Sequence, residues 1–202
     1  MNLDYVDIFY SHRYDPQTPL EETMQALVDI VRSGKALYAG ISNYPSEAAA
    51  FAYNYLWEHD TPCLLHQLKY NMFHRNPEDE GLLAQAKENG SGFIAFSPLA
   101  QGLLTDRYLN GIPADSRAAR NFTLKQDILT PELVEKLGRL NKLAGERGQT
   151  LAQMALAWVL HDSQVTSVIV GASSVEQLDS NLQSIMNTGF TDEEIELINS
   201  LT

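Results

Sequence analysis

The sequence predicts an α/β protein built around a parallel β-sheet. Apolar segments typical of strands begin near residues 5, 36, 63 and 92, and this spacing of roughly 30 residues is the size of a βα unit. Segments with helical spacing of apolar residues separate them. The strands are apolar along most of their length, which favours a parallel sheet covered on both faces.

The first βα unit has a strand over 5–10 and a helix with a marked beginning and end. Thr18 can cap the helix, Pro19 suits the first helical position, and Glu21 completes a capping box. The helix is expected to stop at Ser33-Gly34, because glycine commonly follows the last helical turn.

The next three units follow the same pattern. We expect strands over 36–41, 63–67 and 92–96, with helices over 46–56 and 80–89.

The regular spacing breaks between Phe96 and Val165. This interval holds a polar loop over 101–127 and then two helices, which start at Thr130-Pro131 and at Thr150.

A fifth strand is predicted over 165–170. A helix from Ser174 follows, with Gln177 completing its capping box, and the last helix is capped by Thr191 with Glu194. Five βα units fit either a small doubly wound sheet or part of an eight-stranded barrel, whose complete form needs about 250 residues.

Composition and charge exclude several classes of protein. The chain has 202 residues, 44% of them hydrophobic, which excludes disorder. Its net charge of −12 disfavours binding to nucleic acid or to anionic membranes. No apolar run is long enough to span a membrane, and residues 1–4 do not resemble a signal peptide. The lone Cys63 cannot form an internal disulfide, so we expect a reducing, cytoplasmic setting.

Polar side chains follow every predicted strand, at the ends where parallel α/β folds place their chemistry. Amides and hydroxyls could bind a carboxamide, an aromatic ring could stack on a heterocycle, and a helix N-terminus could hold a phosphate. We therefore predict a site for a large polar cofactor. The segments concerned are Ser11-His12-Arg13, Ser42-Asn43-Tyr44, Gln67, Phe96 to Gly102, and Gly171 to Ser174 with Gln177 and Asn181.

Each of these residues also has a purely structural interpretation. Without further context, His12 is more often a buried, hydrogen-bonded histidine, and Phe96 could be core. His66 and His74 lack the spacing of a zinc site, so no metal is expected. Loop arginines are more often solvated than bound to phosphate; here they are Arg107, Arg117 and Arg120.

Four segments together resemble the aldo-keto reductase superfamily, in particular the bacterial branch of L-glyceraldehyde 3-phosphate reductases, which also resembles potassium-channel β subunits. They are residues 3–13, 40–44, 96–104 and 171–178. The resemblance implies a (β/α)8 TIM-barrel type of fold that binds NADP(H). It aligns the chain from the fourth barrel strand onward, so we expect residues 1–202 to be a single partial barrel domain of about five βα units plus C-terminal helices.

The resemblance also assigns roles to individual residues. His12 matches a catalytic position that orients the carbonyl, whereas the family's Tyr, Asp and Lys belong to the part that precedes the match. The cofactor residues divide by the portion of NADP(H) that they would contact. At the nicotinamide end, Ser42, Asn43 and Gln67 match the positions that bind the carboxamide, and Phe96 matches the ring that stacks on nicotinamide. Along the phosphates, Ser97, Leu99 and Gln101 match the positions that line the pyrophosphate, and Arg107 and Arg117 match those that contact phosphate or ribose. At the adenine and 2′-phosphate end, the matching residues are Ser173, Gln177 and Asn181, on the segment that begins at Gly171.

Two kinds of function are thus expected. The first is NADPH-dependent reduction of small aldehydes or ketones, with L-glyceraldehyde 3-phosphate and methylglyoxal as candidate substrates and a homo-oligomer as a possible assembly. The chain alone, without the family's Tyr, Asp and Lys, is expected not to be competent. The alternative is a non-catalytic fragment that binds NADP(H) or docks on a partner. A third possibility is no independent function, because an open arc leaves two sheet edges bare.

Overall fold

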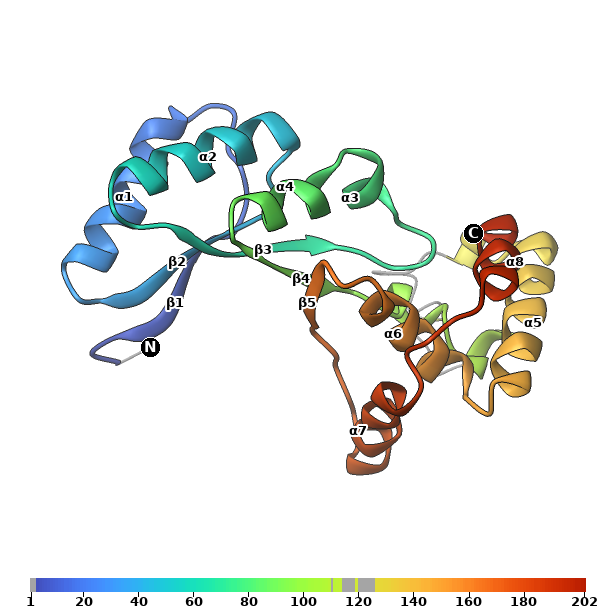
Figure 1. Cartoon of the computed structure of the whole chain (residues 1–202). Helices are drawn as coiled ribbons and strands as arrows, with labels where there is room; N and C mark the ends of the chain where they lie inside the picture. The colour runs from blue at the N-terminus through green and yellow to red at the C-terminus, as the bar shows by residue number, and fades with distance from the viewer. Residues whose placement is uncertain (1–2, 110, 114–118, 120–125) are drawn as a thin grey trace. The chain divides into compact units, whose positions relative to one another are not determined.

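The computed structural model of the chain describes residues 3–109, 111–113, 119 and 126–202. It contains a five-stranded sheet in which the strands follow one another in chain order (Figure 1). The pairs from β1 to β4 are parallel. The strands are β1 (Val6–Ser11), β2 (Ala36–Ser42), β3 (Cys63–Lys69), β4 (Gly92–Phe96) and β5 (Val165–Val168).

This sequential order decides between the two predicted architectures. A doubly wound sheet reverses its strand order at a switch point, whereas a barrel adds each strand beside the previous one. The helices agree, because α1 (Leu20–Arg32), α2 (Ser46–Glu58) and α4 (Leu82–Glu88) lie on the same face of the sheet (Figure 1). The predicted α/β fold of the TIM-barrel type is therefore confirmed.

The chain forms two compact units, each with its own core. Unit 1 comprises Met1–Lys69, Asn76–Phe96 and Gln164–Ser167, and it contains the sheet up to Ser167 with α1, α2, α4 and the short α3 (Asn76–Asp79). Its buried apolar side chains lie between the helices and the sheet. They include Met24, Val28, Ile41, Ala49, Ala52, Leu56, Ala86, Phe93 and Ala95.

On the other face of the sheet, large side chains pack over glycines of neighbouring strands. A methyl group at Gly40 would lie 2.7 Å from Cε1 of Tyr10, and one at Gly92 would lie 2.7 Å from Cδ2 of Leu65. The two glycines therefore make room for these side chains. Such interleaving across strands is typical of the layered interior of a barrel.

Unit 2 comprises Tyr70–Arg75, Ser97–Ser163 and Val168–Thr202. Its interior includes Leu104, Tyr108, Leu137, Leu140, Leu151, Met154, Leu156, Ile198 and Leu201. Among the helices of the described residues, none is both long and apolar enough to cross a membrane. The helices of unit 2 are α5 (Pro131–Glu146), α6 (Leu151–His161), α7 (Val175–Leu182) and α8 (Asp192–Leu201), with 3₁₀ turns η1 (Ala100–Gly102), η2 (Asp106–Tyr108), η3 (Gln126–Ile128) and η4 (Gln183–Met186).

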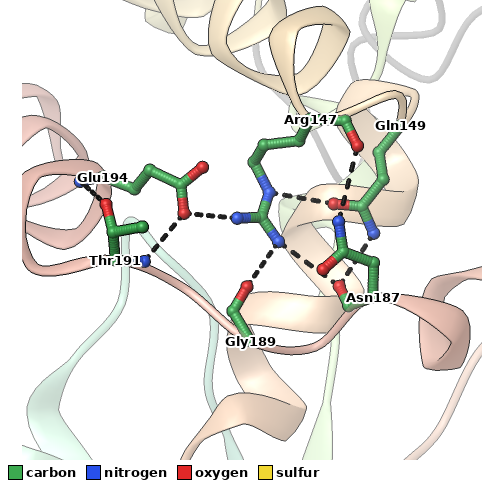
Figure 2. A network of polar contacts seen from close by, with 6 residues as sticks. All are labelled: Arg147, Gln149, Asn187, Gly189, Thr191 and Glu194. Atoms are coloured by element: carbon green, nitrogen blue, oxygen red, sulfur yellow. Dashed lines mark hydrogen bonds and ion pairs between the residues drawn. The ribbon is translucent and has the colours of Figure 1, made fainter.

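The buried Arg147, at the end of α5, binds the segment that precedes α8 (Figure 2). The Arg147 side chain is 4% exposed and forms an ion pair with Glu194. Its guanidinium also donates to the carbonyl oxygens of Gly189 at 2.9 Å and Asn187 at 3.3 Å, and it stacks over the Phe190 ring at 3.7 Å. Every side of this group thus has a partner, which is how a protein tolerates a buried charge.

The predicted helix starts at Thr130, Thr150 and Thr191 are confirmed, since each hydroxyl accepts from the backbone N–H three residues on. The prediction for Thr18 is wrong. Its hydroxyl donates to Asp15 at 2.8 Å, and α1 starts after Pro19 with no side-chain cap.

Several boundaries and one helix cap also differ from the prediction. The helix expected from Glu80 begins at Leu82, because Gly81 has φ of 70° and separates it from α3. β5 ends at Val168, and the next two residues line a cleft instead of continuing the strand. The capping box at Ser174 is half formed: Ser174 accepts from the N–H of Gln177, whereas the Gln177 side chain binds Ser173.

Candidate functional site

In unit 1, Asn43 links the carboxyl ends of three neighbouring strands. Its backbone has φ of 56°, a left-handed conformation that asparagine tolerates better than most residues. Its N–H donates to the carbonyl oxygen of Gln67 at 3.2 Å. Its Nδ2 donates to the Ser42 hydroxyl at 2.9 Å and to the carbonyl oxygen of His12 at 3.0 Å. The structure thus brings together four of the predicted site residues.

Sequence reasoning did not find the hydroxyl pair that supports these strand ends. The hydroxyls of Ser11 and Tyr44 lie 2.6 Å apart, and Tyr44 is 1% exposed. Burial raises the pKa of Tyr44, while the contact with Ser11 opposes this increase. Since Ser11 and Tyr44 are 33 residues apart, only the parallel pairing of β1 with β2 reveals the contact.

The remaining predicted residues of unit 1 are accessible. His12 is exposed, so the interpretation of His12 as a buried histidine is wrong. Its position at the first residue after β1 is determined by pairing with β2, and its backbone is held by Asn43. Gln67 on β3 and Phe96, the last residue of β4, are half-buried, so Phe96 is not a fully enclosed core residue.

In unit 2, the segment after β4 has an unusual backbone. Ser97, Ala100 and Gln101 have φ of 54°, 47° and 64°, and such left-handed conformations are uncommon outside glycine and cluster at functional sites. The buried Asn71 holds the start of this segment, because its Nδ2 donates to the carbonyl oxygen of Ser97 at 2.9 Å. Asn71 is a positioning residue that the sequence analysis missed.

This segment forms one wall of a cleft of about 960 Å³, which lies wholly within unit 2. The residues after β5, α7, and Thr150 and Ala152 at the start of α6 also line it. The cleft contains the predicted residues Ser97, Leu99, Gln101, Arg107, Gly171, Ser173, Gln177 and Asn181. Arg117, also predicted to bind the cofactor, lies outside the described residues.

Asn181 gives the cleft an unused hydrogen-bond donor. The residue is 5% exposed, and its Nδ2 has no hydrogen-bond partner among the described residues. Buried amide groups are nearly always paired, and leaving one unpaired costs about 1–3 kcal/mol. A buried, unpaired donor in the wall of a cleft is therefore suited to a ligand that brings an acceptor.

The α7 end of the cleft is polar without being strongly cationic. The Gln177 side-chain oxygen accepts from both the N–H and the hydroxyl of Ser173, at 2.7 and 2.9 Å. At the same helix N-terminus, its own backbone N–H holds the pKa of Glu176 below its usual range. Among the described lining residues, exposed Arg107 is the only cationic side chain.

These features fit a dinucleotide better than a metal. A cleft lined by neutral donors and acceptors, one described arginine and an unpaired buried amide could hold a ligand with phosphates and a heterocycle. Within the part of the chain that the structure describes, no group of three His, Cys, Asp or Glu side chains could hold a metal ion.

Comparison with known proteins determines the family. The model of the aldo/keto reductase family matches residues 1–202. The chain belongs to the aldo/keto reductase family. This aldo/keto reductase chain is 51% identical over 199 residues to the L-glyceraldehyde 3-phosphate reductase of Escherichia coli O157:H7, covering 96% of the chain and 58% of that protein.

Two other relatives are more distant. A probable voltage-gated potassium channel subunit beta of Arabidopsis thaliana is 36% identical, and the match covers 92% of the chain and 58% of that protein. The crystal structure of the thermostable aldo-keto reductase Tm1743 with the inhibitor epalrestat superposes with a TM-score of 0.74 at 30% identity, covering 98% of the chain and 61% of that structure. The aldo/keto reductase chain thus spans about three-fifths of the length of the relatives that it matches.

Proposed function

We propose that the protein reduces small aldehydes or ketones with NADPH, and that the 202 residues contribute its cofactor-binding portion. The single observation that carries this proposal is the cleft of unit 2, whose lining includes eight of the predicted cofactor residues, among them Asn181 with its unpaired Nδ2. Membership of the aldo/keto reductase family supports it. L-glyceraldehyde 3-phosphate is the first candidate substrate, because the most similar of the relatives described above is named for it; methylglyoxal is the second.

In this proposal the residues of the two units bind different parts of the cofactor. Ser97, Leu99, Gln101 and Arg107 hold phosphates along the strained segment, and Asn181 donates to an acceptor at the other end of the cleft, with Gly171, Ser173 and Gln177 forming its wall. In unit 1, Ser42, Asn43 and Gln67 offer amide and hydroxyl groups to a carboxamide, and Phe96 offers its ring for stacking. When bound, NADPH supplies the hydride.

His12 is proposed to hold the substrate carbonyl and to assist proton donation to the developing alkoxide. The family's Tyr, Lys and Asp are proposed to lie outside these 202 residues, which are one partial barrel domain. The setting is proposed to be cytoplasmic, where a reduced Cys63 is stable. Burial raises the pKa of Cys63 to about 11, so its thiol stays protonated.

The test is a titration of the chain with NADPH, followed by the change in nicotinamide fluorescence. Replacing Asn181 with Leu should weaken binding about tenfold, the effect of one buried hydrogen bond of about 1.4 kcal/mol. The unfolding free energy of Asn181→Leu should be unchanged or higher, because the variant removes an unpaired buried donor.

The matched control is Asn54→Leu, an exposed asparagine on α2 of unit 1. It should leave NADPH affinity unchanged. Equal affinities of wild type and Asn181→Leu would reject the assignment of the cleft. If NADH bound as tightly as NADPH, the cleft would still be the proposed cofactor site, but the proposed preference for a cofactor with a 2′-phosphate would be rejected.

A further inference from the structure

A second cavity lies in unit 1, at the amino ends of β3 and β4, whereas the candidate site residues of that unit lie at the carboxyl ends of its strands. The cavity measures about 400 Å³, within the size range of small-molecule sites. All of its lining residues belong to unit 1. They are Tyr53, Asn54 and Trp57 on α2, Pro62 and Cys63 where β3 begins, and Glu88, Asn89 and Gly90 between the end of α4 and β4.

Hydrogen bonds fix the loops that form this cavity. The backbone N–H of Thr61 donates to the carbonyl oxygen of Leu56 at 2.9 Å, and that of Ser91 donates to the carbonyl oxygen of Ala86 at 2.9 Å. The Ser91 hydroxyl also donates to the carbonyl oxygen of Cys63, which joins the segments at the amino ends of β3 and β4. The cavity is therefore built into the folded unit, as ligand sites usually are.

The lining offers aromatic surface at two depths. Tyr53 and Cys63 are 3 and 4% exposed, and they form the base of the cavity. The Tyr53 hydroxyl lies 3.0 Å from Nδ1 of His66, so the ring of Tyr53 remains for contact with a ligand. The Trp57 side chain is 71% exposed, and Glu88 is exposed as well, so an indole ring and a carboxylate stand at the rim.

The charge of the lining selects the ligand. Among the described lining residues, Glu88 is the only one that is charged at neutral pH, since burial raises the pKa of Cys63 to about 11 and also raises the pKa of Tyr53. The helices α2 and α4 both end at the cavity. A carboxylate, the face of an indole ring and the C-terminal ends of helices all attract cations. A phosphorylated cofactor is therefore a poor ligand for this cavity.

We propose that this cavity binds a small organic cation, an ammonium or guanidinium group attached to an apolar body. The cationic group would lie against the Trp57 ring and the Glu88 carboxylate, and the apolar body would lie over Tyr53. The side-chain oxygens of Asn54 and Asn89 can accept hydrogen bonds from the N–H groups of the ligand. The site is distinct from the cofactor residues and does not rest on the proposed reduction.

The experiment titrates the chain with phenethylammonium and follows the indole N–H signals by nuclear magnetic resonance. The chain has two tryptophans, and Trp158 is 4% exposed in unit 2, so its signal is an internal reference. The Trp57 signal should move with a dissociation constant of about 1 mM or tighter, and the Trp158 signal should not. Phenylacetate and phenethyl alcohol keep the apolar body but replace the cation with an anion or a neutral group. They should bind at least about tenfold more weakly.

Two variants test the rim of the cavity. Trp57→Leu and Glu88→Gln should each weaken the binding of phenethylammonium about threefold or more, as followed by the backbone N–H signal of Gly90, which every variant retains. Both side chains are exposed, so the variants should fold like the wild type. The matched controls are Phe51→Leu and Glu47→Gln, which change exposed residues of α2 that do not line the cavity and should leave binding unchanged.

Three outcomes would overturn the proposal. Equal binding of the three compounds would show that the cavity selects an apolar body and not a cation. The absence of a Trp57 shift at about 10 mM phenethylammonium would show that the cavity holds no such ligand. Equal losses in the variants and their controls would place the binding elsewhere. None of these measurements depends on cofactor binding or turnover.

Discussion

At the scale of single residues, two buried side chains each hold one nitrogen without a hydrogen-bond partner among the described residues: Nδ2 of Asn181 and Nε2 of His66. Their surroundings differ. Asn181 lies in the wall of a cleft that a ligand can enter. His66 is fully buried in β3, with Nδ1 at 3.0 Å from the Tyr53 hydroxyl. We therefore propose that Asn181 serves ligand binding, whereas His66 belongs to the core, where burial favours its neutral form.

The buried His66 should make the protein sensitive to mild acid. Burial lowers the pKa of His66 from 6.5 to about 4, so between these values the unfolded chain binds a proton that the folded chain does not. Folding stability is then lost as the pH falls from 6.5 towards 4, by about 3 kcal/mol in total. Urea unfolding at pH 7 and at pH 5 should show about 2 kcal/mol of this loss in the wild type and a much smaller loss in His66→Gln.

Carboxylates also titrate at acidic pH, but they do so in the wild type and in the variant alike. His161 is exposed on the last turn of α6, so His161→Gln serves as the matched control and should keep the wild-type dependence on pH. If His66→Gln and wild type lose the same stability between pH 7 and pH 5, His66 does not titrate as burial requires.

At the scale of elements, the local signals in the sequence were sufficient for most helices and strands. Thr150 and Thr191 begin their helices as predicted, because the cap, the third helical residue and the hydrogen bonds between them all lie within four residues. Thr18 shows where this pattern fails. Its hydroxyl donates to the carboxylate of Asp15, three residues before it, so it does not cap α1, which begins without a side-chain cap.

The candidate site likewise contains residues that local sequence signals predict and residues that they do not. Residues next to strand ends, such as Asn43 and Ser97, could be predicted because a strand end is visible in the sequence. Asn71 and Tyr44 could not, because their partners are 26 and 33 residues away. Their roles depend on which loops the fold brings together. No periodicity or motif indicates that Asn71 supports the carbonyl oxygen of Ser97.

The packing of α8 should depend on Arg147 (Figure 2). Arg147→Met leaves the carbonyl oxygen of Gly189 without this donor and the carboxylate of Glu194 without its cation, whereas the carbonyl oxygen of Asn187 keeps the hydrogen bond from Nε2 of Gln149. Removing one member of a buried ion pair costs about 3–5 kcal/mol, and we expect the lower end because Glu194 is 21% exposed and keeps its bond to Thr191. Chemical unfolding followed by circular dichroism measures this loss.

Arg139→Met is the control, since Arg139 is exposed on α5 and exposed substitutions change stability by about 0.5 kcal/mol or less. Arg147→Lys should recover only part of the loss, because an ammonium group cannot reproduce the planar fork of guanidinium donors. A loss below about 1 kcal/mol in Arg147→Met would show that the network in Figure 2 is not what holds α8.

At the scale of the whole molecule, charge is distributed unevenly along the chain. The net charge is −12, and every lysine and arginine lies in residues 1–147. A phosphorylated ligand would therefore find lysine or arginine side chains, such as Arg13 and Arg107, only in that part, whereas the cleft residues after β5 offer it neutral groups.

The 202-residue chain should bind NADPH but reduce aldehydes very slowly. Of the groups that the family resemblance assigns to catalysis, the chain contains only His12, and a positioned general acid contributes about 10²–10⁴-fold to the rate. NADPH oxidation with glyceraldehyde or methylglyoxal should therefore be at least about 10²-fold slower than with the Escherichia coli reductase assayed beside it. Fluorescence titration must first show that the chain binds NADPH, so that slow turnover is not caused by misfolding. A rate within tenfold of that enzyme would place a proton donor inside these residues, and replacing each tyrosine in turn with phenylalanine would identify it.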